Sequence, residues 1–144
     1  DTAAQGDLVE MRFRSVTVET TLDAALDAVH SYLGREGFHV LTDTDLGEAF
    51  AAKLAVSFRT YRVLMVWNPA FSWRAVGVDD KAGPAMMVPV LVQEFEPELV
   101  EVSVPDPGDG SGTFGPGSDT DSSADTIRAT VISRLAGLLE HLAQ

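Results

Sequence analysis

The stretch Phe58–Glu94, FRTYRVLMVWNPAFSWRAVGVDDKAGPAMMVPVLVQE, decides the fold of this chain. Its two apolar runs flank an Asn-Pro turn, two tryptophans and a Gly-Pro break. Apolar runs of this length that end in turn residues are typical of strands, and a run that is apolar on both sides indicates a central place in a sheet. We therefore predict strands over Phe58–Trp67 and Met86–Phe95, joined by a helical turn over Ala70–Val76. Pro89 cannot donate to a ladder, so we expect an edge or a bulge there.

The segments on either side of this stretch show the same two periodicities. Alternating or β-branched residues predict three further strands, and apolar residues at helical spacing predict three further helices. Short polar side chains in front of the helices are suited to cap them, and Gly37 is suited to end the first one. The further strands are expected over Leu8–Val18, Phe38–Thr42 and Glu98–Val104. The first further helix is expected after a cap at Thr20 or Thr21, the second over Leu46–Leu54 with Asp43 or Asp45 as its cap, and the third after a cap at Asp125 or Thr126.

This order of elements predicts an α+β fold in one domain over residues 1–144. The elements follow as β-α-β-(short α)-β-β-β-α, and consecutive late strands favour a mostly antiparallel sheet with the helices on one face, a two-layer sandwich. Residues 1–7 are expected to form a loose tail, residues 105–125 a loop rich in Gly, Pro, Ser and Asp, and residues 126–143 the C-terminal helix.

The composition argues against several classes of function. The formal net charge is −12 with ten Lys and Arg, which disfavours binding to nucleic acid or to an acidic membrane surface. The chain has no cysteine, so disulfides, thiolate metal sites and a cysteine nucleophile are excluded. His30, His39 and His141 lack the spacing of metal ligands, and we expect no metal and no cofactor. We expect a cytoplasmic protein; export after removal of a signal peptide is the alternative, because the sequence starts at Asp1.

Residues from about Val16 to Pro107 resemble the bacterial and archaeal domain of unknown function 302 family. The resemblance is carried by TLDAALDAVHSYLGREGFHVLTDTD, by AAKLAVSFRTYRVL, by the Asn-Pro pair, by the apolar strand that ends in Glu94 and by VEVSVPDP. It implies a β-α-β-β-β-β-α sandwich that pairs as a homodimer. The positions that match the family are Asp45, Lys53, Tyr61, Arg62, Asn68, Pro69 and Glu94.

The chain also departs from this family. Members typically carry a cysteine directly before Asn-Pro and a Pro-Cys-Asn in the next strand, whereas this chain has Trp67 in the first place and Met87, Val88 and Pro89 in the second. A thiol-based redox or metal role is therefore not carried over to this chain.

The matched polar residues, together with two tryptophans, are the candidate ligand-binding site. A carboxylate beside a cation can orient a small ligand or act as an acid–base pair; the structural alternative is a helix cap, a turn and a surface ion pair. An aromatic and methionine set, Trp67, Phe71, Trp73, Met86 and Met87, could line an apolar cavity, or equally a core or an interface. The candidate residues are Asp45, Lys53, Arg62, Trp67, Asn68, Trp73 and Glu94.

Two functions follow from these observations. The favoured one is a non-catalytic module that binds a small ligand or a protein partner, because none of the catalytic motifs that can be recognised in a sequence is found in this chain. The alternative is an enzyme of a small-molecule pathway, in which Asp45 or Glu94 acts as acid–base and Arg62 or Lys53 holds an anionic substrate.

Overall fold

The computed structural model describes residues 12–108 and 123–144. Its strands form one antiparallel sheet in the order β1-β5-β4-β3-β2. The strands are β1 (Phe13–Val18), β2 (His39–Asp45), β3 (Tyr61–Trp67), β4 (Val88–Glu96) and β5 (Leu99–Pro105). The helices are α2 (Leu22–Arg35), α3 (Leu46–Leu54), α4 (Pro69–Val78) and α5 (Ala124–Leu142), with a 3₁₀ turn η1 (Gly83–Met86). The predicted α+β class is confirmed.

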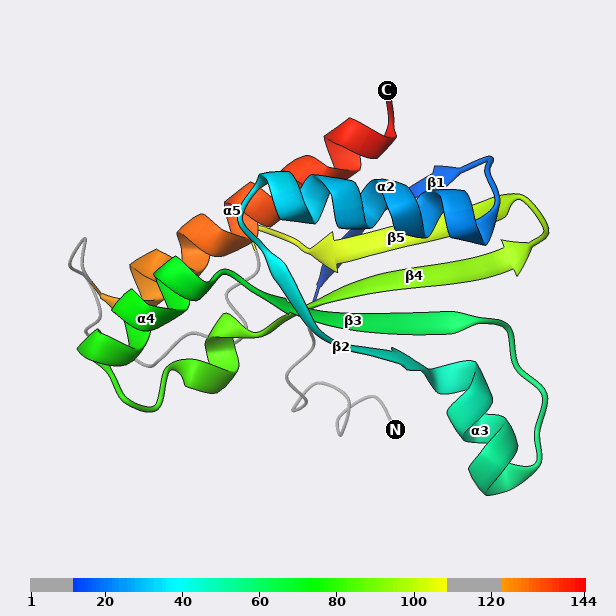
Figure 1. Cartoon of the computed structure of the whole chain (residues 1–144), viewed down its shortest axis with the longest axis horizontal. Coiled ribbons are helices and arrows are strands. Elements are labelled where there is room, and N and C mark those ends of the chain that lie inside the picture. Colours follow the sequence, from blue (N-terminus) through cyan, green and yellow to red (C-terminus); the bar gives the residue numbers. More distant parts are fainter. Residues whose placement is uncertain (1–11, 109–122) are drawn as a thin grey trace, which may run out of the picture.

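Helices α2 and α5 lie together over one face of the sheet (Figure 1). Alternate residues of β3, β4 and β5 point into the layer between helices and sheet, as strand periodicity requires. Fully burying a Val or Leu side chain contributes about 1.5–3 kcal/mol, so this layer is the main source of stability. Its members with no more than 1% exposure include Val29, Leu33, Leu64, Val66, Val88, Val90, Val92, Val100, Val102, Val104, Leu135 and Leu138.

A second, smaller cluster lies where α4, η1 and the start of α5 meet. Ala75, Ala82, Met86, Ala124 and Ile127 are buried there, and Phe71 packs against both this cluster and the main core. Helix α4 is therefore held mainly by α5 and η1 rather than by the sheet.

The other face of the sheet carries a different set of side chains. Directly paired residues of antiparallel strands point to the same side, so the register identifies the residues that face away from the helices. None of the described helices lies on this face, which we call the open face. Its members are Phe13, Ser15 and Thr17 of β1, Glu101, Ser103 and Pro105 of β5, Pro89, Leu91 and Gln93 of β4, Tyr61, Val63, Met65 and Trp67 of β3, and His39, Thr42 and Thr44 of β2.

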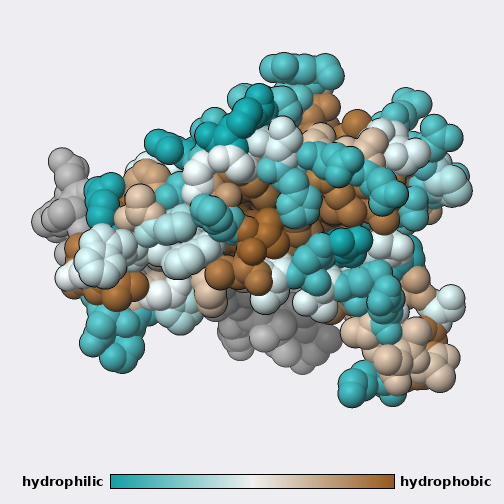
Figure 2. Space-filling model, viewed as in Figure 1, coloured by the Kyte–Doolittle hydropathy of each residue, from teal (hydrophilic) through white to brown (hydrophobic). Residues whose placement is uncertain are grey.

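Helix α3 projects from the end of the sheet where β2 stops and β3 starts (Figure 1). The helix begins after the Asp45 cap and ends before Ala55, which adopts a left-handed φ of 57°. Leu54 at its last position and Val56 and Phe58 after it remain exposed, and the projecting end shows a mostly apolar surface (Figure 2). The predicted bounds of α3 are confirmed, but Leu54, which was predicted on its apolar stripe, is 65% exposed.

The stretch that decides the fold differs from the prediction in several respects, since its helix runs over Pro69–Val78 and its second strand over Val88–Glu96. β3 starts at Tyr61 rather than at Phe58. It is also not the central strand, since β4 occupies the centre of the sheet and β3 lies between β4 and the edge strand β2. Pro89 therefore lies in the central strand, so the edge prediction was wrong, and the bulge of β4 lies between Glu94 and Glu96 instead. The strand tolerates Pro89 because pairing with β5 begins at Leu91, and Pro89 pairs only with Met65 of β3 in the described register.

Several other boundaries moved. Of the predicted strand Leu8–Val18, the structure describes Phe13–Val18, and the predicted tail over residues 1–7 lies outside the described residues, as do residues 109–122 of the predicted loop. Helix α5 begins two residues before the predicted residue 126, because Ser123 rather than Asp125 or Thr126 caps it: its Oγ accepts the Thr126 N–H at 3.1 Å. In the described parts of the chain, no helix is both apolar and long enough to cross a membrane.

Candidate functional site

Three of the candidate residues lie at the end of the sheet next to α3. Asp45 ends β2 and pairs directly with Arg62 of β3. Arg62 in turn pairs with Val92 of β4, two residues before Glu94, whose N–H donates to the Thr60 carbonyl at 3.1 Å. Three separate segments thus bring Asp45, Arg62 and Glu94 to one place.

Arg62 is engaged with a residue that is not among the candidates. Its Nε donates to Asp43 Oδ1 at 2.7 Å and its Nη2 donates to Asp43 Oδ2, a two-pronged ion pair whose side chains are 27% and 28% exposed. The hydrogen bonds from Arg62 lower the pKa of Asp43 below its ordinary value of 3.8, although burial opposes the shift. The same pair raises the pKa of Arg62, and the nearby carboxylates Asp45 and Glu48 add to that rise.

Asp45 has a structural task of its own. Its Oδ1 accepts the Gly47 N–H at 2.9 Å, which caps α3, and the Tyr61 N–H at 3.2 Å, which fixes the start of β3. The same oxygen is therefore engaged by two backbone donors, as the structural alternative of a helix cap requires. At this end of the sheet, Asp45 thus caps α3 while Arg62 is held by Asp43.

The remaining candidates lie elsewhere. Lys53 is exposed in the last turn of α3. Trp67 and Asn68 follow at the opposite end of β3, about 16 Å from Arg62 at the usual rise of a strand. Trp73 lies on α4 and is 82% exposed. The structure therefore divides the candidate set between two ends of the sheet, and Asn68 does not lie with Asp45, Arg62 and Glu94.

Asn68 is buried where α4 begins, near the end of α2. Its Nδ2 donates weakly to the Glu36 carbonyl at 3.4 Å and lies 3.3 Å from the place a side chain at Gly37 would occupy. This contact ties the end of α2 to the start of α4, which matches the structural alternative. The aromatic and methionine set does not form one cavity either, because Phe71 and Met86 belong to the packed cluster while Trp73 and Met87 face solvent.

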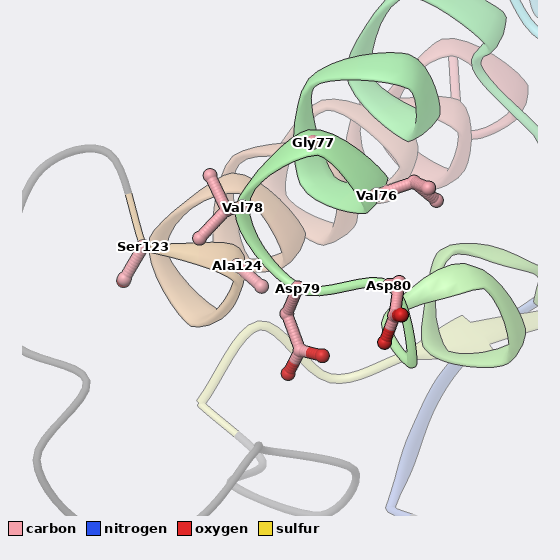
Figure 3. Close-up of a pocket in the computed structure, with 7 residues that line it drawn as sticks. All are labelled: Val76, Gly77, Val78, Asp79, Asp80, Ser123 and Ala124. Atoms are coloured by element: carbon pink, nitrogen blue, oxygen red, sulfur yellow. The ribbon is translucent and has the colours of Figure 1, made fainter.

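A hollow of about 570 Å³ lies between the end of α4 and the start of α5 (Figure 3). Its walls come from Val76, Gly77, Val78 and Ala124, and the carboxylates of Asp79 and Asp80 lie on one side of it. None of the candidate residues lines it. Asp79 accepts the Lys81 N–H and Asp80 pairs with Lys81 Nζ, so both are engaged locally. Across the described residues, no three His, Asp or Glu side chains are grouped as metal ligands.

Two features were not predicted from the sequence. Asp43 was considered only as a helix cap, because its partner Arg62 becomes its neighbour only through the register of β2 and β3. Arg59 was not a candidate at all, although its guanidinium contacts the rings of Phe58 and Phe95. The adjacent Phe58 was a signal in the sequence, whereas Phe95 reaches Arg59 only through the pairing of β3 with β4.

Comparison with known proteins identifies the family. The family described as "Domain of unknown function DUF302" matches residues 14–140. The chain belongs to this family. The resemblance seen in the sequence is thus confirmed, and this DUF302 member has no cysteine.

A solved structure shares the fold. The crystal structure of an uncharacterized conserved DUF302 protein from Bacillus stearothermophilus superposes with a TM-score of 0.74 at 23% sequence identity. The alignment covers 92% of this chain and 99% of that one. No curated protein matches the chain. This similarity establishes the fold of the DUF302 protein, whereas its function has to be argued from its own surface.

Proposed function

We propose that this DUF302 protein is a non-catalytic interaction module that pairs as a homodimer through the open face of its sheet. The observation that carries the proposal is the distribution of side chains on that face. Its centre, on β3 and β4, is apolar: Val63, Met65, Trp67, Pro89 and Leu91. Its margins on β1 and β2 carry hydroxyl groups, at Ser15, Thr17, Thr42 and Thr44. An apolar centre with a polar rim is the usual anatomy of a protein–protein interface.

The charge of the protein favours a second copy on this face. With a net charge of −12, two copies repel each other wherever acidic surfaces meet. Of the residues that the register places on the open face, Glu101 is the one carboxylate. Electrostatic repulsion therefore opposes self-association least on the open face. A two-fold axis there would bring the apolar centres of the two copies into contact.

The dimensions of the face are adequate for a weak to moderate dimer. Five strands about 4.8 Å apart, each about 23 Å long, give a flat area of about 550 Å². Standard interfaces bury roughly 800 Å² of accessible surface per partner. Side chains that protrude from the sheet make the accessible area of the open face larger than its flat area, which brings it closer to that value.

Native mass spectrometry and light scattering of the full chain test this proposal. We expect a dimer at micromolar concentration, and we expect Met65→Lys or Leu91→Lys to shift it to monomer by placing a charge in the apolar centre. The matched control is Leu54→Lys, which adds the same charge on the exposed end of α3 and should leave the dimer intact. Circular dichroism confirms that each variant is folded.

The proposal fails if the wild-type protein is monomeric at about 100 µM, well above the dissociation constant of a functional dimer. It fails as well if Leu54→Lys dissociates the dimer while the folded Met65→Lys and Leu91→Lys variants retain it, since the interface would then lie at α3.

A further inference from the structure

Arg59 lies in an unusual setting for an exposed arginine. Its guanidinium carbon is 4.4 Å from the centre of the Phe58 ring and 4.6 Å from the centre of the Phe95 ring. Its Nε donates to Gln93 Oε1 at 2.8 Å, and Gln93 is only 7% exposed. Two rings and one buried amide therefore hold the guanidinium in a defined position.

The backbone beneath Arg59 is also fixed. The Arg59 carbonyl packs so tightly against α3 that a side chain carbon at Gly47 would lie 2.4 Å from it. The next two residues are bound on either side: Thr60 accepts the Glu94 N–H at 3.1 Å, and Tyr61 donates to Asp45 at 3.2 Å. The cation is thus preorganised by α3, β2 and β4 together, which lowers the entropic cost of binding a ligand.

Among the described residues, none contacts the outer edge of this guanidinium through a hydrogen bond or an ion pair. No carboxylate of the described residues forms an ion pair with Arg59, although the sequence holds 22 acidic residues. With Nε bound to Gln93, the two terminal nitrogens still present a planar fork of donors. Such a fork matches the two oxygens of a carboxylate.

We propose that Arg59, Phe58, Phe95 and Gln93 form a binding site for a carboxylate carried on an apolar body. The fork binds the carboxylate, and the phenyl rings, 43% and 44% exposed, contact the apolar body. A monoanion fits the site better than a phosphate dianion, because the rest of the protein is strongly acidic. Gln93 belongs to the open face at its α3 end. The carboxylate therefore comes either from a free organic acid or from a second copy of this chain, and the site itself does not depend on the homodimer.

Nuclear magnetic resonance titration of the full ¹⁵N-labelled chain tests the site with benzoate as the probe and benzamide as its neutral counterpart. We expect benzoate to shift the Arg59 Nε–H and the Gln93 amide signals with a millimolar dissociation constant, and benzamide to bind at least about tenfold more weakly. Arg59→Lys keeps the charge but removes the fork, and should weaken benzoate about tenfold. Gln93→Glu supplies a carboxylate within the protein and should abolish binding.

Arg74→Lys is the matched control, because Arg74 is exposed and its guanidinium lies 5.5 Å from the Phe71 ring. The proposal is overturned if Arg74→Lys weakens benzoate as much as Arg59→Lys does, if benzamide binds as tightly as benzoate, or if inorganic phosphate binds more tightly than benzoate. Native mass spectrometry then separates the two sources. Benzoate that dissociates a dimer supports a carboxylate of the second copy, and benzoate that leaves the assembly unchanged supports a free acid.

Discussion

Asp43 and Arg62 form a two-pronged ion pair between neighbouring strands. They lie two strand positions apart across β2 and β3, where the bulge between Val40 and Thr42 sets the register. A change in that register by one residue would turn Asp43 to the other side of the sheet and separate the pair. The ion pair therefore reports on the correct pairing of β2.

The stability that this pair contributes depends on pH. The pKa of Asp43 is lower in the folded state than its ordinary value of 3.8 because Arg62 donates to its charged form. The contribution is therefore complete above the unfolded pKa and is lost as the pH falls through the folded one. We expect Asp43→Asn to lower the free energy of unfolding by about 1 kcal/mol at pH 7, since the pair is partly exposed. The difference should shrink below about pH 4, as measured by urea denaturation between pH 7 and pH 3.

A difference between wild type and Asp43→Asn that stays constant down to pH 3 would contradict this account, because it would show that the charge of Asp43 is not what stabilises the fold. The matched control is Asp23→Asn, which removes an exposed carboxylate from the first turn of α2.

At the level of elements, α3 depends on a close approach rather than on a large buried surface. Gly47 is its buried residue, and the Arg59 carbonyl occupies the space that a side chain there would need. The helix is thus attached by the Asp45 cap and by this backbone contact, while its apolar residues remain largely at the surface.

Substituting Gly47 tests this attachment. Alanine normally favours a helix over glycine by about 1 kcal/mol, but the clash with Arg59 should reverse the sign and lower the free energy of unfolding by about 1–3 kcal/mol for Gly47→Ala. Gly34→Ala is the control, because a side chain carbon at Gly34 in α2 would have open space around it. We expect Gly34→Ala to be stabilising by about 0.5–1 kcal/mol in the same thermal and urea measurements. Equal gains from both substitutions would show that the contact is not tight in solution.

Across the whole molecule, local stability should be highest in the layer between the helices and the sheet and lower in the elements outside that layer. The buried residues of α5 belong to the main core, whereas α3 contacts chiefly β3 and exposes most of its surface. We expect amides over Ala49–Leu54 to exchange with solvent roughly a hundredfold or more faster than those over Val131–Leu138. Hydrogen exchange with mass spectrometry measures both segments in one sample. Comparable protection would show that another surface covers α3 in the assembled protein.

The sequence was sufficient to predict the elements and their layers. Helix α3 was predicted to the residue, because the Asp45 cap and the apolar spacing are local signals. Pro89 was misplaced because its cost depends on where pairing with β5 begins, which is a property of two strands. The start of β3 was misplaced because Phe58 and Arg59 continue the pattern of a strand, while the Arg59 side chain packs against the rings of Phe58 and Phe95.

The candidate site could be predicted only in part for the same reason. Asp45 and Arg62 were selected as members of one candidate set, and the structure does bring them together, but the Asp43 partner of Arg62 is set by strand register and cannot be seen in one sequence. Asn68 was grouped with them because it matches a family position, and the tryptophans because they could line an apolar cavity. Arg62 and Asn68, however, lie at the two ends of β3, and an extended strand separates residues that are six positions apart by roughly 20 Å.

The different surroundings of the two tryptophans give the protein a built-in optical probe. Trp67 lies on the open face and is partly buried, whereas Trp73 on α4 is 82% exposed. The emission of Trp73 should lie at long wavelength and be quenched readily by acrylamide, while that of Trp67 reports on its own neighbourhood. A Trp73→Phe protein would therefore carry a single tryptophan, Trp67, at the proposed interface, and its assembly could be followed in dilute solution by tryptophan emission without any attached dye.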